Sequence, residues 1–172
     1  MHPLIREAFN ITKELGPVTF VGAVAVFLHT KNTRESRDLD FVIAKQITRE
    51  ELLNKDYKFI TENGKEKTYT PRNYKIDIYV DRPLNRIPIE TIIKTSQDFP
   101  IDKKGNTVNA MGLEALILAK FRANRQEQDY PDLRGLAIQR FSDINWKEME
   151  KLVDDATEVE DIRSTLKYIA KN

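Results

Sequence analysis

Hydrophobic positions along the first two thirds of the chain form short runs separated by turn residues, a pattern typical of alternating helices and strands. Over about residues 2–15 the apolar residues recur at helical spacing, and Gly16-Pro17 should end this helix. Asn63-Gly64 indicates a hairpin turn between two extended segments. The extended, β-prone runs are expected at residues 18–21, 39–44, 57–61, 67–70, 74–80, 98–102 and 106–110.

Two shorter helices are expected between these runs. The first covers about residues 23–29, where an apolar segment follows a turn at Gly22. The second covers about residues 49–55, because Thr48 and Glu51 have the spacing of a capping box. Strands and helices therefore alternate along this part of the chain, which indicates a sheet with helices packed on its faces.

From Met111 onward the apolar spacing changes to the helical period of 3.6 residues. Helices are expected at about residues 111–127, 130–139, 145–155 and 157–170. Asn145 and Thr157 are the expected N-caps of the last two. The sequence thus predicts an α+β fold, with a mixed β-sheet core and flanking helices in residues 1–110. Residues 111–172 are expected to form a C-terminal helical bundle packed on that core.

Composition sets broad limits on the class of protein. The chain has 172 residues, of which 32% are charged, and its formal net charge of +1 indicates no overall field for nucleic acid. It contains no cysteine, which excludes disulfides and thiolate zinc sites and fits a reducing compartment. No apolar run approaches the roughly 20 residues of a membrane span, so we expect a soluble, cytoplasmic protein without membrane partners.

Three carboxylates stand in apolar, β-prone segments. Asp38 and Asp40 lie two residues apart at the start of one run, and Asp77 interrupts a second. Side chains two residues apart on a strand share a face, so Asp38 and Asp40 should project together, roughly 7 Å apart at the backbone. Oxygen ligands of this kind suit Mg²⁺ or Mn²⁺. Gly22 precedes them and could let the backbone approach phosphate at a helix N-terminus. Together these features indicate a metal-dependent nucleotidyl-transfer site.

These residues, in this order, resemble the minimal nucleotidyltransferases of the DNA polymerase β-like superfamily, and more narrowly the abortive-infection-toxin type. The family pattern has a Gly-containing turn into a helix, an Arg-x-Thr/Ser-x-Asp-hydrophobic-Asp segment, a hydrophobic-Asp-hydrophobic strand, and a later helix carrying Lys and Arg. The matching positions are Gly22, Arg34, Ser36, Asp38, Asp40, Asp77, Lys120, Arg122, Arg125, Asp129 and Asp132. One departure is Ala23, where the family usually has Gly or Ser after the glycine.

The resemblance implies the role of each matching residue. Asp38 and Asp40 would hold Mg²⁺ or Mn²⁺ on the triphosphate, and Asp77 would complete the metal site or act as the base. The resemblance also implies an NTP substrate. The nucleotide would be contacted by Gly22, Ala23, Arg34, Ser36, Arg37, Lys120 and Arg125.

Several of these positions have a simpler structural interpretation. Asp77 could be an exposed residue of a half-buried strand, and Lys120 could be a solvated lysine at the end of an apolar helix. Arg125 and Asp129 have the spacing of a helix ion pair. Asp132 could be a first-turn acid of the following helix. A nuclease could also use three carboxylates, although the glycine turn favours a triphosphate.

Three functional hypotheses remain open at this point. The first is transfer of NMP to RNA, most plausibly a tRNA end, as a toxin or defence component. The second is transfer of NMP to a cognate partner protein, which suits the near-neutral charge. The third is an NTP-binding module without turnover, suggested by Ala23. The basic residues that favour RNA are Lys65, Lys67, Arg72, Lys75, Lys103, Lys104, Arg122 and Arg125.

Overall fold

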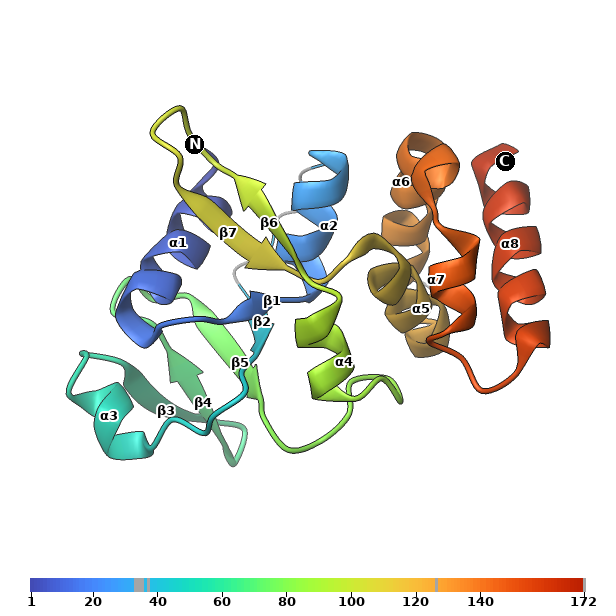
Figure 1. Ribbon diagram of the computed structural model, residues 1–172. Coiled ribbons are helices and arrows are strands. Elements are labelled where there is room, and N and C mark those ends of the chain that lie inside the picture. The colour runs from blue at the N-terminus through green and yellow to red at the C-terminus, as the bar shows by residue number, and fades with distance from the viewer. Residues whose placement is uncertain (33–35, 37, 126, 172) are drawn as a thin grey trace.

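The computed structural model describes residues 1–32, 36, 38–125 and 127–171 (Figure 1). Its α-helices are α1 (Pro3–Leu15), α2 (Gly22–Thr30), α3 (Arg49–Leu53), α4 (Ile89–Lys94), α5 (Leu113–Ala123), α6 (Asp129–Arg140), α7 (Trp146–Glu150) and α8 (Ala156–Lys171). Its strands are β1 (Thr19–Phe20), β2 (Asp38–Val42), β3 (Lys58–Glu62), β4 (Lys65–Tyr69), β5 (Lys75–Tyr79), β6 (Gln97–Pro100) and β7 (Thr107–Ala110). A short 3-10 helix, Phe141–Asp143, follows α6.

The strands form one mixed sheet of seven, in the order β3-β4-β5-β2-β1-β7-β6. β2 runs parallel to β5 and β1 runs parallel to β7, whereas the other neighbouring strands are antiparallel. Figure 1 shows α1, α2 and α4 packed around this sheet, and α5 to α8 side by side on the right, beyond α2. The predicted α+β class, with a mixed sheet and flanking helices, is confirmed.

Local sequence signals explain where several elements begin and end. Helix α1 starts with Pro3 in its first turn. It ends at Gly16, whose φ of +90° is a conformation that glycine adopts readily and other residues rarely do. The capping box of Thr48 and Glu51 is present at the start of α3. Between β3 and β4, Asn63-Gly64 has positive φ at both residues, as a tight hairpin turn requires.

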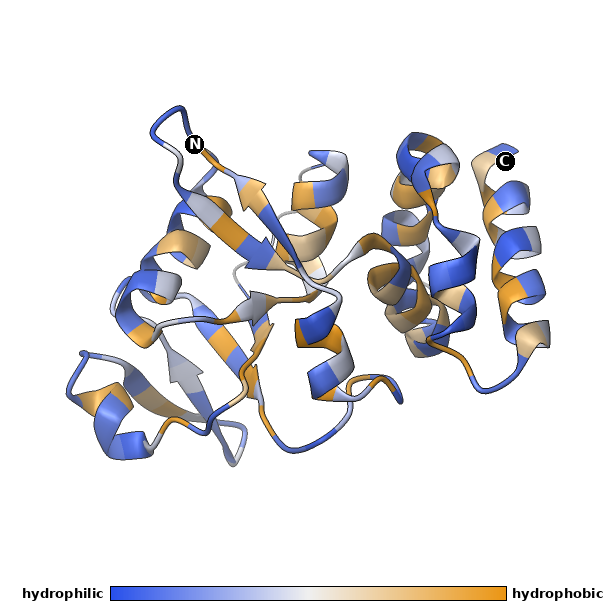
Figure 2. Cartoon of the chain, in the orientation of Figure 1, coloured by the Kyte–Doolittle hydropathy of each residue, from blue (hydrophilic) through white to orange (hydrophobic). Residues whose placement is uncertain are grey.

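Helix α2 connects the sheet to the C-terminal helices, because it packs against β2 on one side and against α5 and α6 on the other. α8 buries a stripe of apolar residues at helical spacing, visible as orange bands in Figure 2, while most of its other positions are polar. The buried residues of sheet and helices form one apolar cluster. After β7 ends at Ala110, the elements in the described part of the chain are all helices, and the division into units 1–110 and 111–172 stays a prediction.

Two local predictions were wrong. Helix α4 was not expected, because six residues are too few to show a helical period; burial of Ile89 and Ile92 stabilises it instead. Thr157 is not an N-cap, because α8 already begins at Ala156. Asp155 takes that role, and its Oδ1 accepts a hydrogen bond from the Thr157 amide at 2.9 Å. None of the described helices is long and apolar enough to cross a membrane.

Candidate active site

The three predicted acids lie on one face of the sheet. In the parallel ladder between β2 and β5, Asp38 is the partner of Lys75 and Asp40 is the partner of Asp77. Because strand side chains alternate between faces, all four project together, while the alternate residue Leu39 is buried in the core on the other side. The backbone register of two strands that are distant in sequence therefore brings the acids together.

Lys75 occupies the space between the acids. Its Nζ lies 3.0 Å from Asp38 Oδ2 and 3.5 Å from Asp77 Oδ2. Burial opposes the charged form of Lys75, but the hydrogen bond to Asp38 and the negative charge of Asp77 outweigh it and raise its pKa. Burial raises the pKa of the Asp40 carboxyl, and the neighbouring charges of Asp77 and Asp38 raise it further. The site thus combines a stabilised ammonium with crowded carboxylates.

Gly22 lies directly against Asp40. It has a φ of +56°, and a Cβ atom placed there would come 2.7 Å from Asp40 Oδ2. The amide of Val21 donates a hydrogen bond to the Asp40 carbonyl at 2.9 Å, which ties the start of α2 to β2. The N-terminus of α2, with its free N–H groups and positive dipole end, is therefore held close to the acids.

We expect Gly22→Ala to weaken both the fold and the binding of NTP, for two reasons. The added methyl group would collide with the Asp40 carboxylate, and alanine is strained at this positive φ. The φ penalty alone is about 1–3 kcal/mol. Gly64→Ala is the matched control, since Gly64 has a φ of +73° but no atom within 4 Å of the added Cβ. Urea unfolding and NTP titration of both variants measure the difference. Equal effects on NTP affinity would show that contact with Asp40 is unimportant.

A cleft of about 560 Å³ lies above the acids, between the sheet and the C-terminal helices, a size within the usual range for small-molecule sites. Its lining includes every predicted site residue that the structure describes, namely Gly22, Ala23, Ser36, Asp38, Asp40, Asp77, Lys120 and Arg125. Arg34 and Arg37 lie outside the described residues. Among the described residues, no three carboxylate or imidazole groups converge closely enough to hold a metal ion as they stand.

The donor chemistry nevertheless fits a divalent cation. Asp38, Asp40 and Asp77 offer carboxylate oxygens on one face and line the cleft, and the side chains of Asp38 and Asp77 are 54% and 47% exposed. The Lys75 ammonium already stands as a positive charge between two of them. These acids are therefore the residues that could hold Mg²⁺ or Mn²⁺ after local side-chain rotation.

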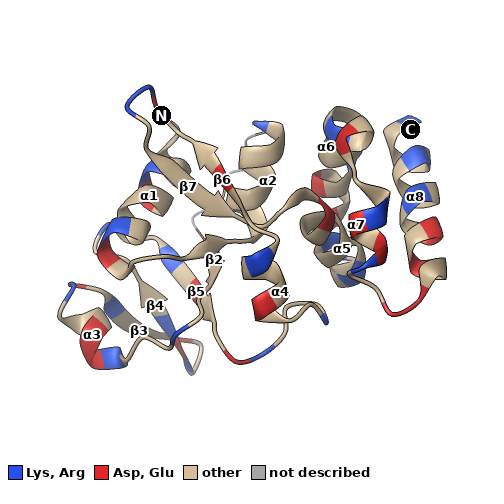
Figure 3. Ribbon diagram, in the orientation of Figure 1, with Lys and Arg blue, Asp and Glu red and all other residues tan. Residues whose placement is uncertain are grey.

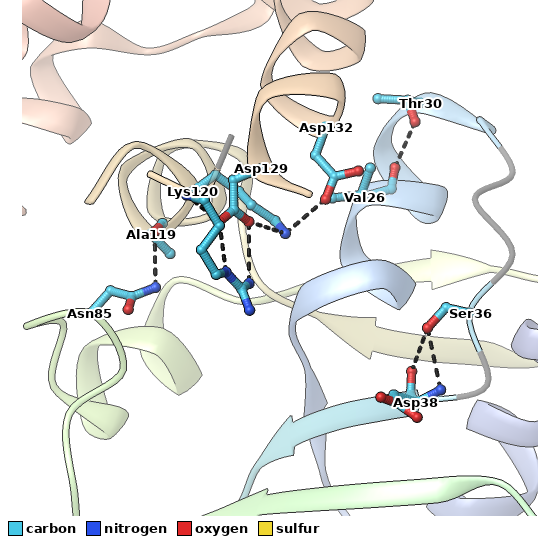
Figure 4. A network of polar contacts seen from close by, with 10 residues as sticks. Val26, Thr30, Ser36, Asp38, Asn85, Ala119, Lys120, Asp129 and Asp132 are labelled. Atoms are coloured by element: carbon cyan, nitrogen blue, oxygen red, sulfur yellow. Dashed lines mark hydrogen bonds and ion pairs between the residues drawn. The ribbon is translucent and has the colours of Figure 1, made fainter. Parts of the chain in front are cut away.

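Ser36 shapes the approach to β2. Its hydroxyl donates to the Asp38 carbonyl at 3.1 Å and lies 3.3 Å from the Asp38 amide, as Figure 4 shows. This local turn sets the direction in which β2 begins. A contact between Ser36 and a nucleotide stays a prediction.

On the helical side of the cleft, Lys120 of α5 is buried rather than solvated, which contradicts the simpler interpretation of this lysine. Its Nζ lies 2.9 Å from Asp129 Oδ1 and 2.7 Å from Asp132 Oδ2, both in the first turn of α6 (Figure 4). Arg125, whose side chain is 63% exposed, pairs with Asp129 from the segment before α6. Although burial would raise the pKa of Asp129, hydrogen bonds from Arg125 and Lys120 lower it. These charges tie α5 to α6.

Lys75 and Asn85 line the cleft although the sequence did not single them out as site residues. Lys75 was noted only as one of several basic residues, although its position two before Asp77 predicts a shared face. Asn85 also lines the cleft, and its Nδ2 donates to the Ala119 carbonyl at 2.9 Å (Figure 4). This hydrogen bond connects the turn that follows β5 to helix α5. No sequence signal indicates that contact, because the two residues are far apart along the chain.

Comparison with solved structures bears on the fold. An antigenic nucleotidyltransferase-like protein from Paracoccidioides brasiliensis aligns with a TM-score of 0.57 at 13% identity, covering 98% of this chain and 87% of that one. The fold is nucleotidyltransferase-like. JHP933 from Helicobacter pylori aligns with a TM-score of 0.54 at 17% identity, covering 99% of this chain and 90% of that one. No protein-family model and no curated protein sequence matches the chain.

At these identities the nucleotidyltransferase-like likeness concerns the fold. The roles of the site residues and the narrower resemblance to abortive-infection toxins stay predictions, which rest on the order and placement of the residues in this chain.

Proposed function

We propose that this protein transfers a nucleoside monophosphate from an NTP to an acceptor hydroxyl, with Mg²⁺ or Mn²⁺ bound by Asp38, Asp40 and Asp77. The observation that carries the proposal is that Asp40 lies against Gly22 at the start of α2 and has Asp77 as its ladder partner. That arrangement supports the proposal because it brings carboxylate oxygens, which suit a cation, close to a helix N-terminus, which suits an anion. Its nucleotidyltransferase-like fold supports the same assignment.

In the proposed reaction, the acceptor oxygen forms a bond to the α-phosphorus and the bond to the β-phosphate oxygen breaks, releasing pyrophosphate. When bound, the metal would stabilise the charge on the attacking and leaving oxygens. The backbone at Gly22 and Ala23 would hold the triphosphate, and Arg125, exposed at the cleft, would neutralise it further. We assign Asp77 as the carboxylate that accepts the proton of the acceptor, in addition to its metal contact.

We propose RNA, and in particular a tRNA end, as the acceptor. Charges of both signs are mixed over most of the chain in Figure 3, so recognition must rely on a local surface. The sheet face that carries the acids continues onto β4 and β3, because Tyr69 is the ladder partner of both Lys75 and Lys58. Lys58 and Lys65 are exposed on that face, and Ile60 is 43% exposed there. Lysines beside the aromatic ring of Tyr69 suit a single RNA strand, because lysine pairs with phosphates and an aromatic ring stacks on bases.

The test is a label-transfer assay with each α-labelled NTP, Mg²⁺ or Mn²⁺, total RNA and, separately, cell protein. We expect label in RNA that disappears in the Asp38→Ala/Asp40→Ala variant. Label in protein instead would favour the partner-protein acceptor, which the net charge of +1 also suits. NTP binding without transfer would leave a binding module, as Ala23 in the phosphate turn would suggest, and RNA cleavage without label would indicate a nuclease. Growth arrest on expression of the active protein, but not of the variant, would support a toxin role.

A further inference from the structure

Lys75 holds a position that its strand register imposes. It is the direct ladder partner of Asp38, and it lies two residues before Asp77 on the same face of β5. The ammonium bridges these two acids at 3.0 and 3.5 Å. The Lys75 side chain is only 21% exposed, whereas the two carboxylates remain about half exposed, at 54% and 47%. The acids are therefore open to solvent while the lysine is settled between them.

The space that Lys75 fills is the one a divalent cation would need. A cation that bridges Asp38 and Asp77 must lie between their oxygens, where Nζ now lies. An ammonium and a metal ion cannot share that space, because they overlap and repel each other. The ammonium also offsets the repulsion between these two neighbouring carboxylates.

We propose that Lys75 is a resident counter-ion which a divalent cation must displace, so that the free protein binds metal weakly and metal enters together with the triphosphate. This inference rests on the proposed function of the site. Triphosphate oxygens supply further ligands to the ion, and they also offer a negative partner to the displaced ammonium. Displacement is therefore favourable only when both arrive, which makes binding of metal and NTP cooperative.

The experiment measures Mn²⁺ binding by the electron paramagnetic resonance signal of the free ion, without NTP. Because Lys75 keeps most molecules in a form that excludes the ion, Lys75→Met should bind Mn²⁺ at least about fivefold more tightly than the wild type. Lys75→Gln, which keeps a polar side chain, should behave in the same way and covers the case in which the methionine variant folds poorly. Lys58→Met is the charge control, because Lys58 lies on the same sheet face but two strands away.

A second measurement adds a non-hydrolysable NTP analogue. We expect it to tighten Mn²⁺ binding strongly in the wild type and in Lys58→Met, and much less in Lys75→Met. Unchanged Mn²⁺ affinity in both Lys75 variants would overturn the inference, as would an equal gain in Lys58→Met.

Asp38→Asn separates this inference from the proposed function. If Asp38→Asn weakens Mn²⁺ binding while Lys75→Met has no effect, the ion binds at the acids and only the role of Lys75 is refuted. If Asp38→Asn also has no effect, the ion binds elsewhere, and the proposed metal site and the inference are both refuted.

Discussion

Replacing Asp40 with Asn should lower the rate of nucleotidyl transfer by about 10³-fold or more and leave the fold intact. Asp40 lies beside Asp77 in the ladder and against Gly22, so the change removes a charge at the centre of the proposed site. Asn has nearly the same shape, and neither the backbone of β2 nor the hydrogen bond from Val21 to the Asp40 carbonyl depends on the side chain. Label transfer with saturating NTP measures the loss.

The stability of this variant should change in the opposite direction to its activity. Burial and the neighbouring acids raise the pKa of Asp40 above its ordinary value of 3.8, so the charged form is less favourable in the folded state than in the unfolded state. The stabilising contribution of Asp40 to the free energy of unfolding is therefore fully present below pH 3.8, and it is lost as pH rises through the raised pKa. At neutral pH Asp40→Asn removes that penalty, and its urea midpoint should equal or exceed that of the wild type.

Asp98→Asn is the matched control for Asp40→Asn. Asp98 lies on β6, at the far edge of the same sheet, where its Oδ1 accepts a hydrogen bond from Asn109 Nδ2 at 2.9 Å. The control makes the same change in charge and shape away from the cleft, and it should keep its activity. Activity of Asp40→Asn within tenfold of Asp98→Asn would contradict the proposed role of Asp40.

Replacing Lys120 with Met should destabilise the protein by about 3–5 kcal/mol, because it removes the cation from a buried group of charges. The Lys120 ammonium contacts Asp129 and Asp132, whose side chains are 1% and 6% exposed. Asp129 keeps Arg125, but the excess negative charge stays buried between α5 and α6. Urea unfolding followed by circular dichroism measures the loss of stability.

Lys151→Met is the control for the loss of an ion pair as such. Lys151 contacts Glu148 at 2.6 Å, but the two side chains are 67% and 51% exposed, so its loss should cost less than about 1 kcal/mol. Lys120→Met/Asp132→Leu should recover part of the stability, since it also removes one of the buried acids. A stable Lys120→Met protein that no longer binds NTP would instead support a direct nucleotide contact for Lys120, which lines the cleft.

The local sequence was sufficient to predict much of the fold and the acids of the candidate site. The spacing of Asp38 and Asp40 on a strand requires a shared face, and the capping box and Asn63-Gly64 turn predict their elements from a few adjacent residues. Such features depend on contacts within one helical turn or one hairpin, so the residues that decide them are neighbours in the sequence. Helix α4 escaped prediction because packing, not local spacing, stabilises it.

By itself, then, the sequence determined the acids, the glycine turn and the alternation of helices and strands, because these depend on the local geometry of the backbone. Only the tertiary structure decided that Asp77 is the partner of Asp40, and that Lys75 stands between the acids. It also decided that Lys120 is buried in contact with the carboxylates of Asp129 and Asp132. These contacts join segments that come together only when β2 pairs with β5 and α5 packs on α6. The free energy that stabilises this arrangement comes from packing throughout the core.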